Sequence, residues 1–257
     1  MQTNNPPDWE RTEAAIWRGR LAYLRPVREL DPIRLAQLIG IERQKAALCR
    51  NTERFLAGLP ANNALLWGAR GTGKSSLIKA LLNHYAPRGL RLIQIDRQDL
   101  ECLLDIVDEV RDLPQRFVIF IDDLSFEGGE SGYKALKSAL EGSIEAPPCN
   151  VLFYATSNRR HLLAERAEDN VGTQVGRGEL HYTDAVEEKI SLSDRFGLWL
   201  SFYAIDQPGY LEIVDSYFPA HPNRDELHRE ALRFAMTKGS RSGRTAKQFF
   251  NAHTGAG

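Results

Sequence analysis

Five short apolar runs alternate with amphipathic stretches between about residue 40 and residue 205. The runs cover residues 64–67, 90–95, 117–121, 151–155 and 198–203. The middle three are nearly continuous in Ile, Val, Leu and Phe, which is typical of strands buried on both faces of a parallel sheet. Helical spacing occurs at residues 41–57, 75–84, 99–110, 132–141 and 187–195. The alternation predicts an α/β domain over residues 40–205, with a five-stranded parallel sheet covered by helices.

The pattern changes on either side of this domain. Residues 209–217, 225–237 and 243–250 have helical spacing without a strand between them, so we expect a small α-helical lid over residues 206–257. Residues 1–39 contain Trp9 and Trp17 but show no clear periodicity. They predict an irregular N-terminal arm that wraps the main domain, and its aromatic side chains offer an alternative surface for a partner.

The segment after the first apolar run carries the clearest chemistry. It reads Gly68-Ala69-Arg70-Gly71-Thr72-Gly73-Lys74-Ser75-Ser76 and matches the pattern G-x-x-x-x-G-K-S. In such a phosphate-binding loop the glycines let backbone N–H groups point at phosphate oxygens, and the following helix adds its positive end. We therefore expect this segment to bind a nucleoside triphosphate, with Lys74 on the β- and γ-phosphates and the Ser75 hydroxyl on Mg²⁺.

Polar residues end the next two buried runs. Asp122 and Asp123 follow residues 117–121. We expect the Asp122 carboxylate in the Mg²⁺ shell, and we expect the Asp123 carboxylate to polarise the attacking water. Glu127 is the nearest carboxylate that could substitute for Asp123. Asn158 follows the run at residues 151–155 and is expected beside the γ-phosphate, although an Asn after a strand is by itself more often a turn or a helix cap.

Together these features resemble the AAA+ ATPases from about residue 38 to residue 250. The phrase that contains Ile39 and Gly40 resembles the adenine-contacting segment of that superfamily, and residues 68–75, 122–123 and 158 resemble Walker A, Walker B and sensor 1. Arg195 lies in a phrase that resembles the arginine-finger box. Arg244 resembles sensor 2 in the lid, with Arg241 as a close competitor. Residues 122–127, 155–162 and 242–249 look more narrowly like an uncharacterised family of bacterial AAA+ ATP-binding proteins.

The resemblance implies a Mg²⁺-dependent ATPase that assembles with copies of itself and remodels or switches a macromolecular partner. Asp123 departs from it, because the superfamily usually has Glu there, so an ATP-gated binding module with little turnover stays open. Residues 96–100 lack the aromatic-apolar-Gly triplet of protein-threading members, so classical protein threading is disfavoured. A P-loop kinase fits less well, since Arg195 and Arg244 match AAA+ roles, and no Asn-Lys-x-Asp tetrapeptide indicates GTP.

Composition restricts partner and compartment. A net charge of -1 over 257 residues gives no overall attraction to nucleic acid or anionic lipid. We expect a cytoplasmic protein without membrane contact, because no export signal or long apolar stretch occurs and the three cysteines are isolated. The chain from residue 231 onward is basic, whereas residues 165–188 hold seven acidic residues against two basic ones and read as a long loop. An unidentified protein partner is therefore favoured over nucleic acid.

Overall fold

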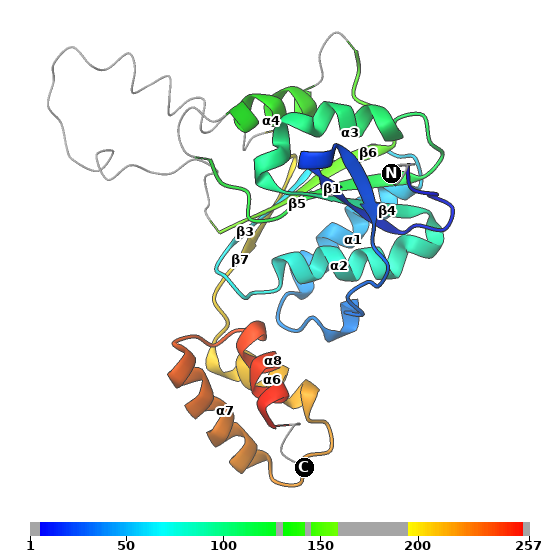
Figure 1. Ribbon diagram of the computed structural model, residues 1–257. Coiled ribbons are helices and arrows are strands. Elements are labelled where there is room, and N and C mark those ends of the chain that lie inside the picture. The colour runs from blue at the N-terminus through cyan, green and yellow to red at the C-terminus, as the bar shows by residue number, and fades with distance from the viewer. Residues whose placement is uncertain (1–5, 127–130, 142–144, 159–194, 254–257) are drawn as a thin grey trace, which may run out of the picture.

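The computed structural model describes residues 6–126, 131–141, 145–158 and 195–253. Figure 1 shows an α/β domain and, below it, a cluster of three helices formed by the C-terminal part of the chain. The acidic loop at residues 165–188, Glu127 and all but the last residue of the helix expected at 187–195 lie outside the described residues.

The sheet of the α/β domain has seven strands in the order β2-β1-β4-β5-β6-β3-β7. Their bounds are β1 Ala14–Arg18, β2 Tyr23–Pro26, β3 Ala64–Gly68, β4 Leu90–Ile95, β5 Arg116–Ile121, β6 Val151–Ser157 and β7 Leu198–Phe202. Every neighbouring pair is parallel except β1 and β2, which are antiparallel. The five expected strands are β3 to β7, and each is confirmed within two residues at its ends.

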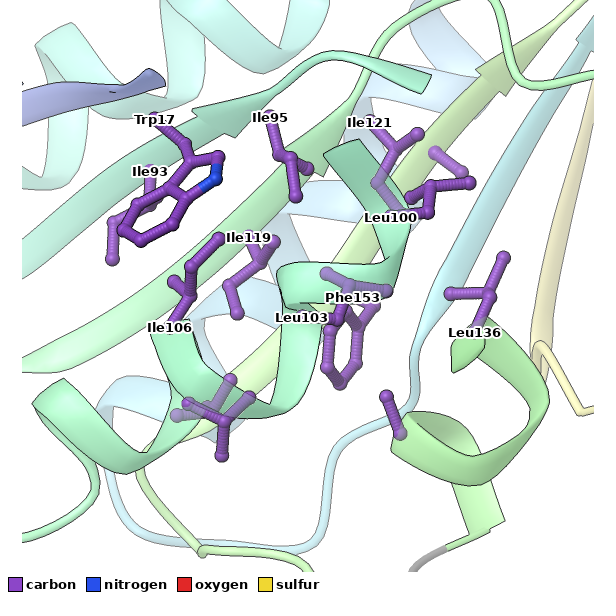
Figure 2. Close-up of a cluster of buried hydrophobic side chains, with 14 of the residues drawn as sticks. Trp17, Ile93, Ile95, Leu100, Leu103, Ile106, Ile119, Ile121, Leu136 and Phe153 are labelled. Carbon is purple, nitrogen blue, oxygen red and sulfur yellow. The ribbon is translucent and has the colours of Figure 1, made fainter. Parts of the chain in front are cut away.

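The prediction of a five-stranded sheet with an irregular arm is wrong for the N-terminal residues. Strands β1 and β2 form a hairpin, and β1 extends the sheet by pairing Ala15 with Ile93 of β4. Trp17 and Trp9 are only 3% and 6% exposed, and Figure 2 shows Trp17 beside Ile93 within the core. These tryptophans therefore belong to the core and offer no surface to a partner. A short strand next to a tight turn has too few positions to show a period of two, and its pairing depends on residues far along the chain.

Helices cover both faces of the sheet. Their bounds are α1 Glu42–Leu56, α2 Lys74–Tyr85, α3 Leu103–Val110 and α4 Ser131–Glu141. Figure 1 shows α1 and α2 on one face and α3 and α4 on the other. Each face has its own core. Leu48 and Leu77 belong to the first. Ile106 and Leu136 belong to the second, and Figure 2 shows both in one cluster with Ile93 of β4 and Ile119 of β5. Burial on both faces explains the uninterrupted apolar runs.

The helix expected at residues 99–110 is divided in two. A 3₁₀-helix over Arg97–Cys102 precedes α3, and the Asp96 carboxylate accepts a hydrogen bond from the Gln98 amide at 3.1 Å, which caps it. The other three described helices of the α/β domain are confirmed within one residue of their expected ends. Among the residues that the structure describes, no helix combines the length and the apolar character that a membrane crossing requires.

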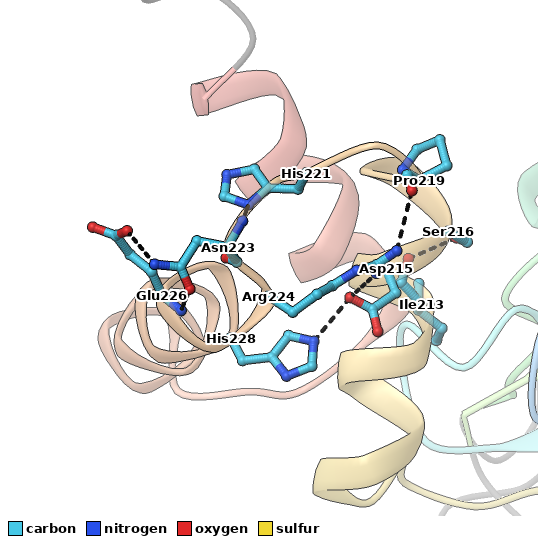
Figure 3. A network of polar contacts seen from close by, with 9 residues as sticks. All are labelled: Ile213, Asp215, Ser216, Pro219, His221, Asn223, Arg224, Glu226 and His228. Carbon is cyan, nitrogen blue, oxygen red and sulfur yellow. Dashed lines mark hydrogen bonds and ion pairs between the residues drawn. The ribbon is translucent and has the colours of Figure 1, made fainter.

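The lid consists of three helices, as expected: α6 Gln207–Tyr217, α7 Arg224–Lys238 and α8 Gly243–His253. It has a core of its own, in which Tyr210, Leu227 and Phe249 are at most 1% exposed. The side chains of Asp206 and Asn223 cap α6 and α7. Figure 3 shows a polar network that joins these two helices, with Asp215 of α6 bound to Arg224 and His228 of α7.

Candidate functional site

The carboxyl ends of β3, β5 and β6 meet at one edge of the sheet. Strand β6 lies between the other two, with Ala155 paired to Ile121 of β5 and Ser157 paired to Trp67 of β3. The loops that follow parallel strands leave the sheet at the same edge. The topology therefore brings together the phosphate-binding loop, the acidic pair after β5 and Asn158 after β6.

The glycines of the loop hold a backbone that other residues disfavour. Gly68, Gly71 and Gly73 have φ angles of 130°, 76° and 95°. A Cβ atom on Gly68 would lie 1.9 Å from the carbonyl oxygen of Phe202 in β7, so the loop leaves β3 in direct backbone contact with its neighbour. Gly73 then precedes the first turn of α2. The result is a glycine-formed cradle at a helix N-terminus, which suits an anion.

Lys74 is held in place within this cradle. Its side chain is buried, and Nζ donates to the carbonyl oxygens of Gly68 and Ala69, both at 2.7 Å, and to Asn158 Oδ1 at 3.3 Å. Burial lowers the pKa of the Lys74 ammonium, while the nearby Asp123 and Asp122 carboxylates oppose that shift. The Lys74 ammonium therefore lies beside the backbone of the cradle, where it can contact a phosphate.

The oxygen atoms around Asp122 are of the type that Mg²⁺ prefers. Ser75 Oγ donates to Asp122 Oδ1 at 2.7 Å, and Thr156 Oγ1 donates to the same oxygen at 2.6 Å. Mg²⁺ is commonly held by one or two protein oxygens while phosphates and water supply the rest. The Ser75 hydroxyl and the Asp122 carboxylate therefore fit such an ion.

Asp123 and Asn158 form a second pair. Asp123 has a φ angle of 55°, an uncommon conformation for a residue with a side chain. Its amide donates to Thr156 Oγ1 at 2.9 Å, and its carboxylate accepts a hydrogen bond from Asn158 Nδ2. Because Asn158 also accepts from Lys74, it links the carboxylate after β5 to the cation of the phosphate-binding loop.

These residues line a cleft of about 660 Å³ between the α/β domain and the lid. Apolar side chains from both parts also line it: Ile39, Ile41, Ile205, Ile213 and Tyr217. Arg244 and Lys247 of α8 also line the cleft. The lid touches the phosphate-binding loop directly, because the Gly243 amide donates to the Gly71 carbonyl oxygen at 3.1 Å. The cleft therefore combines groups that suit an anion with apolar side chains.

Most of the expected site residues lie on this cleft. They are Ile39, Arg70, Gly71, Thr72, Gly73, Lys74, Ser75, Ser76, Asp122, Asp123, Asn158 and Arg244. Gly40, Gly68 and Ala69 do not line it; Gly68 and Ala69 instead accept from Lys74. Thr156, Tyr217 and Lys247 line the cleft but were not expected. An isolated Thr in a strand, or an isolated Tyr or Lys in an amphipathic helix, carries no local signal that marks it as a site residue.

Arg195 does not line this cleft. Its guanidinium forms an ion pair with Glu141 at the end of α4. Ser193 and Asp194, the first two residues of the phrase at 193–197 that resembles the arginine-finger box, lie outside the described residues. Arg241, the competitor of Arg244, is exposed and does not line the cleft either.

Solved structures of remote proteins share this architecture. The Aeropyrum pernix Orc1 protein in complex with DNA is 16% identical, with a TM-score of 0.57 over 81% of this chain. The Thermotoga maritima RuvB Holliday junction branch migration motor is 15% identical, with a TM-score of 0.50, and its match covers 86% of this chain and 72% of RuvB. A chain of the E. coli MS115-1 HORMA:CdnC:Trip13 complex is 13% identical, with a TM-score of 0.53 over 85% of this chain and 90% of that one.

At such low identity these similarities establish the fold alone, an α/β domain with a mostly parallel sheet that matches the fold of AAA+ proteins. The chain spans 58% of the length of the Orc1 chain that it matches. No curated protein sequence matches it. One family model covers residues 10–257, nearly the whole chain. The protein therefore belongs to the family described as protein of unknown function DUF815.

Proposed function

We propose that this protein binds ATP with Mg²⁺ in the cleft and hydrolyses it, as a self-assembling ATPase that remodels or switches a macromolecular partner. One observation carries the proposal: Lys74, Ser75, Asp122, Asp123, Asn158 and Arg244, which come from distant parts of the sequence, all line a single cleft. The AAA+ fold supports an ATPase-type activity. The apolar part of the lining, which includes Ile39 and Tyr217, suits the planar adenine base.

In this proposal the phosphate-binding loop contacts the phosphates, and the oxygen atoms of Ser75 and Asp122 contact Mg²⁺. Lys74 holds the β- and γ-phosphates, while the loop amides and the N-terminus of α2 receive the phosphate oxygens. Ser75 and Asp122 hold Mg²⁺, which when bound would neutralise phosphate charge. Arg244 lies on α8, whose first residue contacts Gly71, so it lines the cleft from the lid near the phosphate-binding loop. We assign it as the sensor 2 arginine in preference to Arg241.

Asp123 orients the attacking water in this proposal, and Asn158 positions Asp123. The hydrogen bond between the Asn158 amide and the Asp123 carboxylate also favours the second candidate, an ATP-gated binding module. The Asp123 side chain is shorter than that of Glu, and its carboxylate already accepts a hydrogen bond from the Asn158 amide, so it is a weaker acceptor for water. The two candidates differ in turnover: the first predicts hydrolysis in the assembled protein, and the second predicts ATP binding with little hydrolysis.

Arg195 is proposed to act on the nucleotide of a neighbouring copy. Arg195 does not line the cleft of its own chain but pairs with Glu141, and this supports a role in trans. Arginines supplied by a neighbour are worth roughly 10³–10⁵ in rate in related chemistry. Mixing Arg195→Ala subunits with Lys74→Ala subunits should restore part of the activity. No recovery at any ratio, with both variants assembled, would contradict action in trans.

The binding step is tested with Lys74→Ala, using Lys134→Ala as the control. Lys134 is exposed on α4 and does not line the cleft, so its loss removes the same charge elsewhere. In a calorimetric titration with ATP and Mg²⁺, Lys74→Ala should weaken binding by about 100-fold, as loss of hydrogen bonds to charged groups predicts. Lys134→Ala should bind like the wild type. Equal affinity of all three proteins would overturn the proposed site.

A further inference from the structure

Thr156 makes three hydrogen bonds to the turn that carries the two functional aspartates. Its hydroxyl donates to Asp122 Oδ1 at 2.6 Å and accepts from the Asp123 amide at 2.9 Å. Its carbonyl oxygen accepts from the Leu124 amide at 2.7 Å. Three successive residues after β5 are thus bound to one residue of β6.

The hydroxyl group is suited to this position by its chemistry. A threonine hydroxyl has one proton to donate and lone pairs to accept with, so it can bind a carboxylate and a backbone amide at the same time. Valine has nearly the same shape but neither capacity. Thr156 is 2% exposed, so water has little access to replace a lost hydroxyl there.

Two features of the aspartates depend on this hydroxyl. The Asp122 carboxylate receives its two donors on the same oxygen, one from Ser75 and one from Thr156, and this arrangement turns it toward the phosphate-binding loop. Asp123 has a positive φ angle, and the hydrogen bond from its amide to Thr156 helps to hold that uncommon conformation.

We infer that Thr156 is a positioning residue for the ATPase reaction: its hydroxyl orients the Asp122 carboxylate for the metal ion and fixes the backbone that presents Asp123. This inference rests on the proposed function. Thr156 does not contact the substrate in this scheme; it acts through the two aspartates. Loss of the Thr156 hydroxyl should therefore impair Mg²⁺-dependent ATP binding and turnover, with little effect on Mg²⁺-free binding of ATP.

Thr52 provides a matched control within the same domain. It is also fully buried, and its hydroxyl donates to the Leu48 carbonyl oxygen at 2.8 Å and lies 2.9 Å from the Tyr154 hydroxyl. None of these partners lines the cleft. Thr52→Val therefore removes a buried hydroxyl that makes two hydrogen bonds but has no connection to the aspartates. It measures the purely structural effect of such a loss.

The experiment compares the wild type with Thr156→Val, Thr156→Ser and Thr52→Val. ATP binding is titrated with and without Mg²⁺, and hydrolysis is followed against free Mg²⁺. We expect Thr156→Val to need about tenfold more Mg²⁺ for half-maximal ATP binding and to lower kcat about 10- to 100-fold, because a hydrogen bond to a charged group is lost. Its Mg²⁺-free affinity for ATP should stay within a factor of about two, since phosphate contacts from the loop are kept.

Thr156→Ser should restore the Mg²⁺ dependence and kcat, and Thr52→Val should match the wild type in both. Three results would overturn the inference: a wild-type Mg²⁺ dependence in Thr156→Val, an equal defect in Thr156→Ser, or an equal defect in Thr52→Val. A wild-type protein that does not bind ATP would overturn the proposed function together with the inference. If ATP binds but is not hydrolysed, the Mg²⁺ dependence of binding still decides the role of Thr156.

Discussion

The two sides of the cleft are built differently. On the sheet side, Lys74, Ser75, Asp122, Thr156 and Asn158 are joined to one another or to the backbone by hydrogen bonds. On the lid side, Arg244 and Lys247 are exposed, and the lid meets the phosphate-binding loop through the backbone of Gly243. The side chains on the sheet side are thus held by hydrogen bonds within the α/β domain, whereas the lid supplies exposed positive charge to the cleft.

This difference follows from what holds each part together. The sheet side is anchored to strands that are buried on both faces, such as β6, in which all seven residues are buried. The lid has a separate and much smaller core. Small cores bury a smaller fraction of their surface and supply less stability. The lid should therefore unfold more easily than the α/β domain.

The largest effect is expected from Phe249→Ala in the lid core. Phe249 is fully buried and packs against the rings of Phe218, Phe234 and His253. Loss of a buried Phe side chain costs about 3–5 kcal/mol, which is large for a core of this size. Hydrogen exchange should show lid amides unprotected while β5 and β6 keep their protection. Met236→Ala, at a side chain that is 81% exposed, should change neither. Simultaneous loss of protection in both parts would contradict the comparison.

Gly71→Ala tests the joint between the two sides. Its φ angle of 76° is unfavourable for Ala, and a Cβ atom there would lie 2.7 Å from the Cβ of Ser242 in the lid. Gly89→Ala is the control, because Gly89 has a φ angle of 93° but open space around it. Both variants should lose about 1–2 kcal/mol of stability from the left-handed backbone. Only Gly71→Ala should also weaken ATP binding and increase proteolysis at the lid; identical behaviour of the two variants would argue against a joint.

Arg244→Ala measures the charge that the lid supplies, with Arg241→Ala as its neighbour outside the cleft. A charge-assisted hydrogen bond is worth about 1.5–3 kcal/mol, so hydrolysis should fall roughly 10- to 100-fold in Arg244→Ala. Arg241→Ala should stay near the wild-type rate. The two variants are compared by kcat and KM at saturating Mg²⁺. If Arg241→Ala is the more defective, the assignment of the lid arginine must be exchanged.

The smallest effect concerns the network between α6 and α7 in Figure 3. Partial burial by itself would raise the pKa of the Asp215 carboxyl, but the hydrogen bonds and charges of His228 and Arg224 outweigh it and hold the pKa below its ordinary value. A lowered folded-state pKa adds stability at pH values above the ordinary one, and this stability is lost as the pH falls through the lowered value. Because the Asp215 side chain is 33% exposed, the gain should be under about 1 kcal/mol.

Asp215→Asn should therefore destabilise the lid slightly at neutral pH and less at an acidic pH, because the stability gain is lost as the pH falls through the lowered pKa of the wild-type carboxyl. Denaturation of wild type and variant at both pH values measures the difference. Ser216→Ala, which removes a side chain bound to the Ile213 carbonyl oxygen, serves as a control without a titrating group. A difference between Asp215→Asn and the wild type that is the same at both pH values would contradict the electrostatic explanation.

The sequence alone determined the features that depend on contiguous residues. Five strands, the described helices and the lid were predictable, because burial on two faces gives continuous apolar runs and amphipathic packing gives helical spacing. The phosphate-binding loop was recognisable because its chemistry needs glycines, Lys74 and Ser75 at set intervals within one loop. The roles of its residues in binding remain predictions.

Only the tertiary structure decided which distant residues meet. The register of β6 between β3 and β5 brings the Thr156 hydroxyl to both aspartates, and a Thr in an apolar strand gives no sign of this. The N-terminal hairpin joins the sheet through β4, and Tyr217 reaches the cleft through the position of the lid. Such contacts depend on strand pairing and domain placement over long separations in the chain, for which a local pattern of residues contains no information.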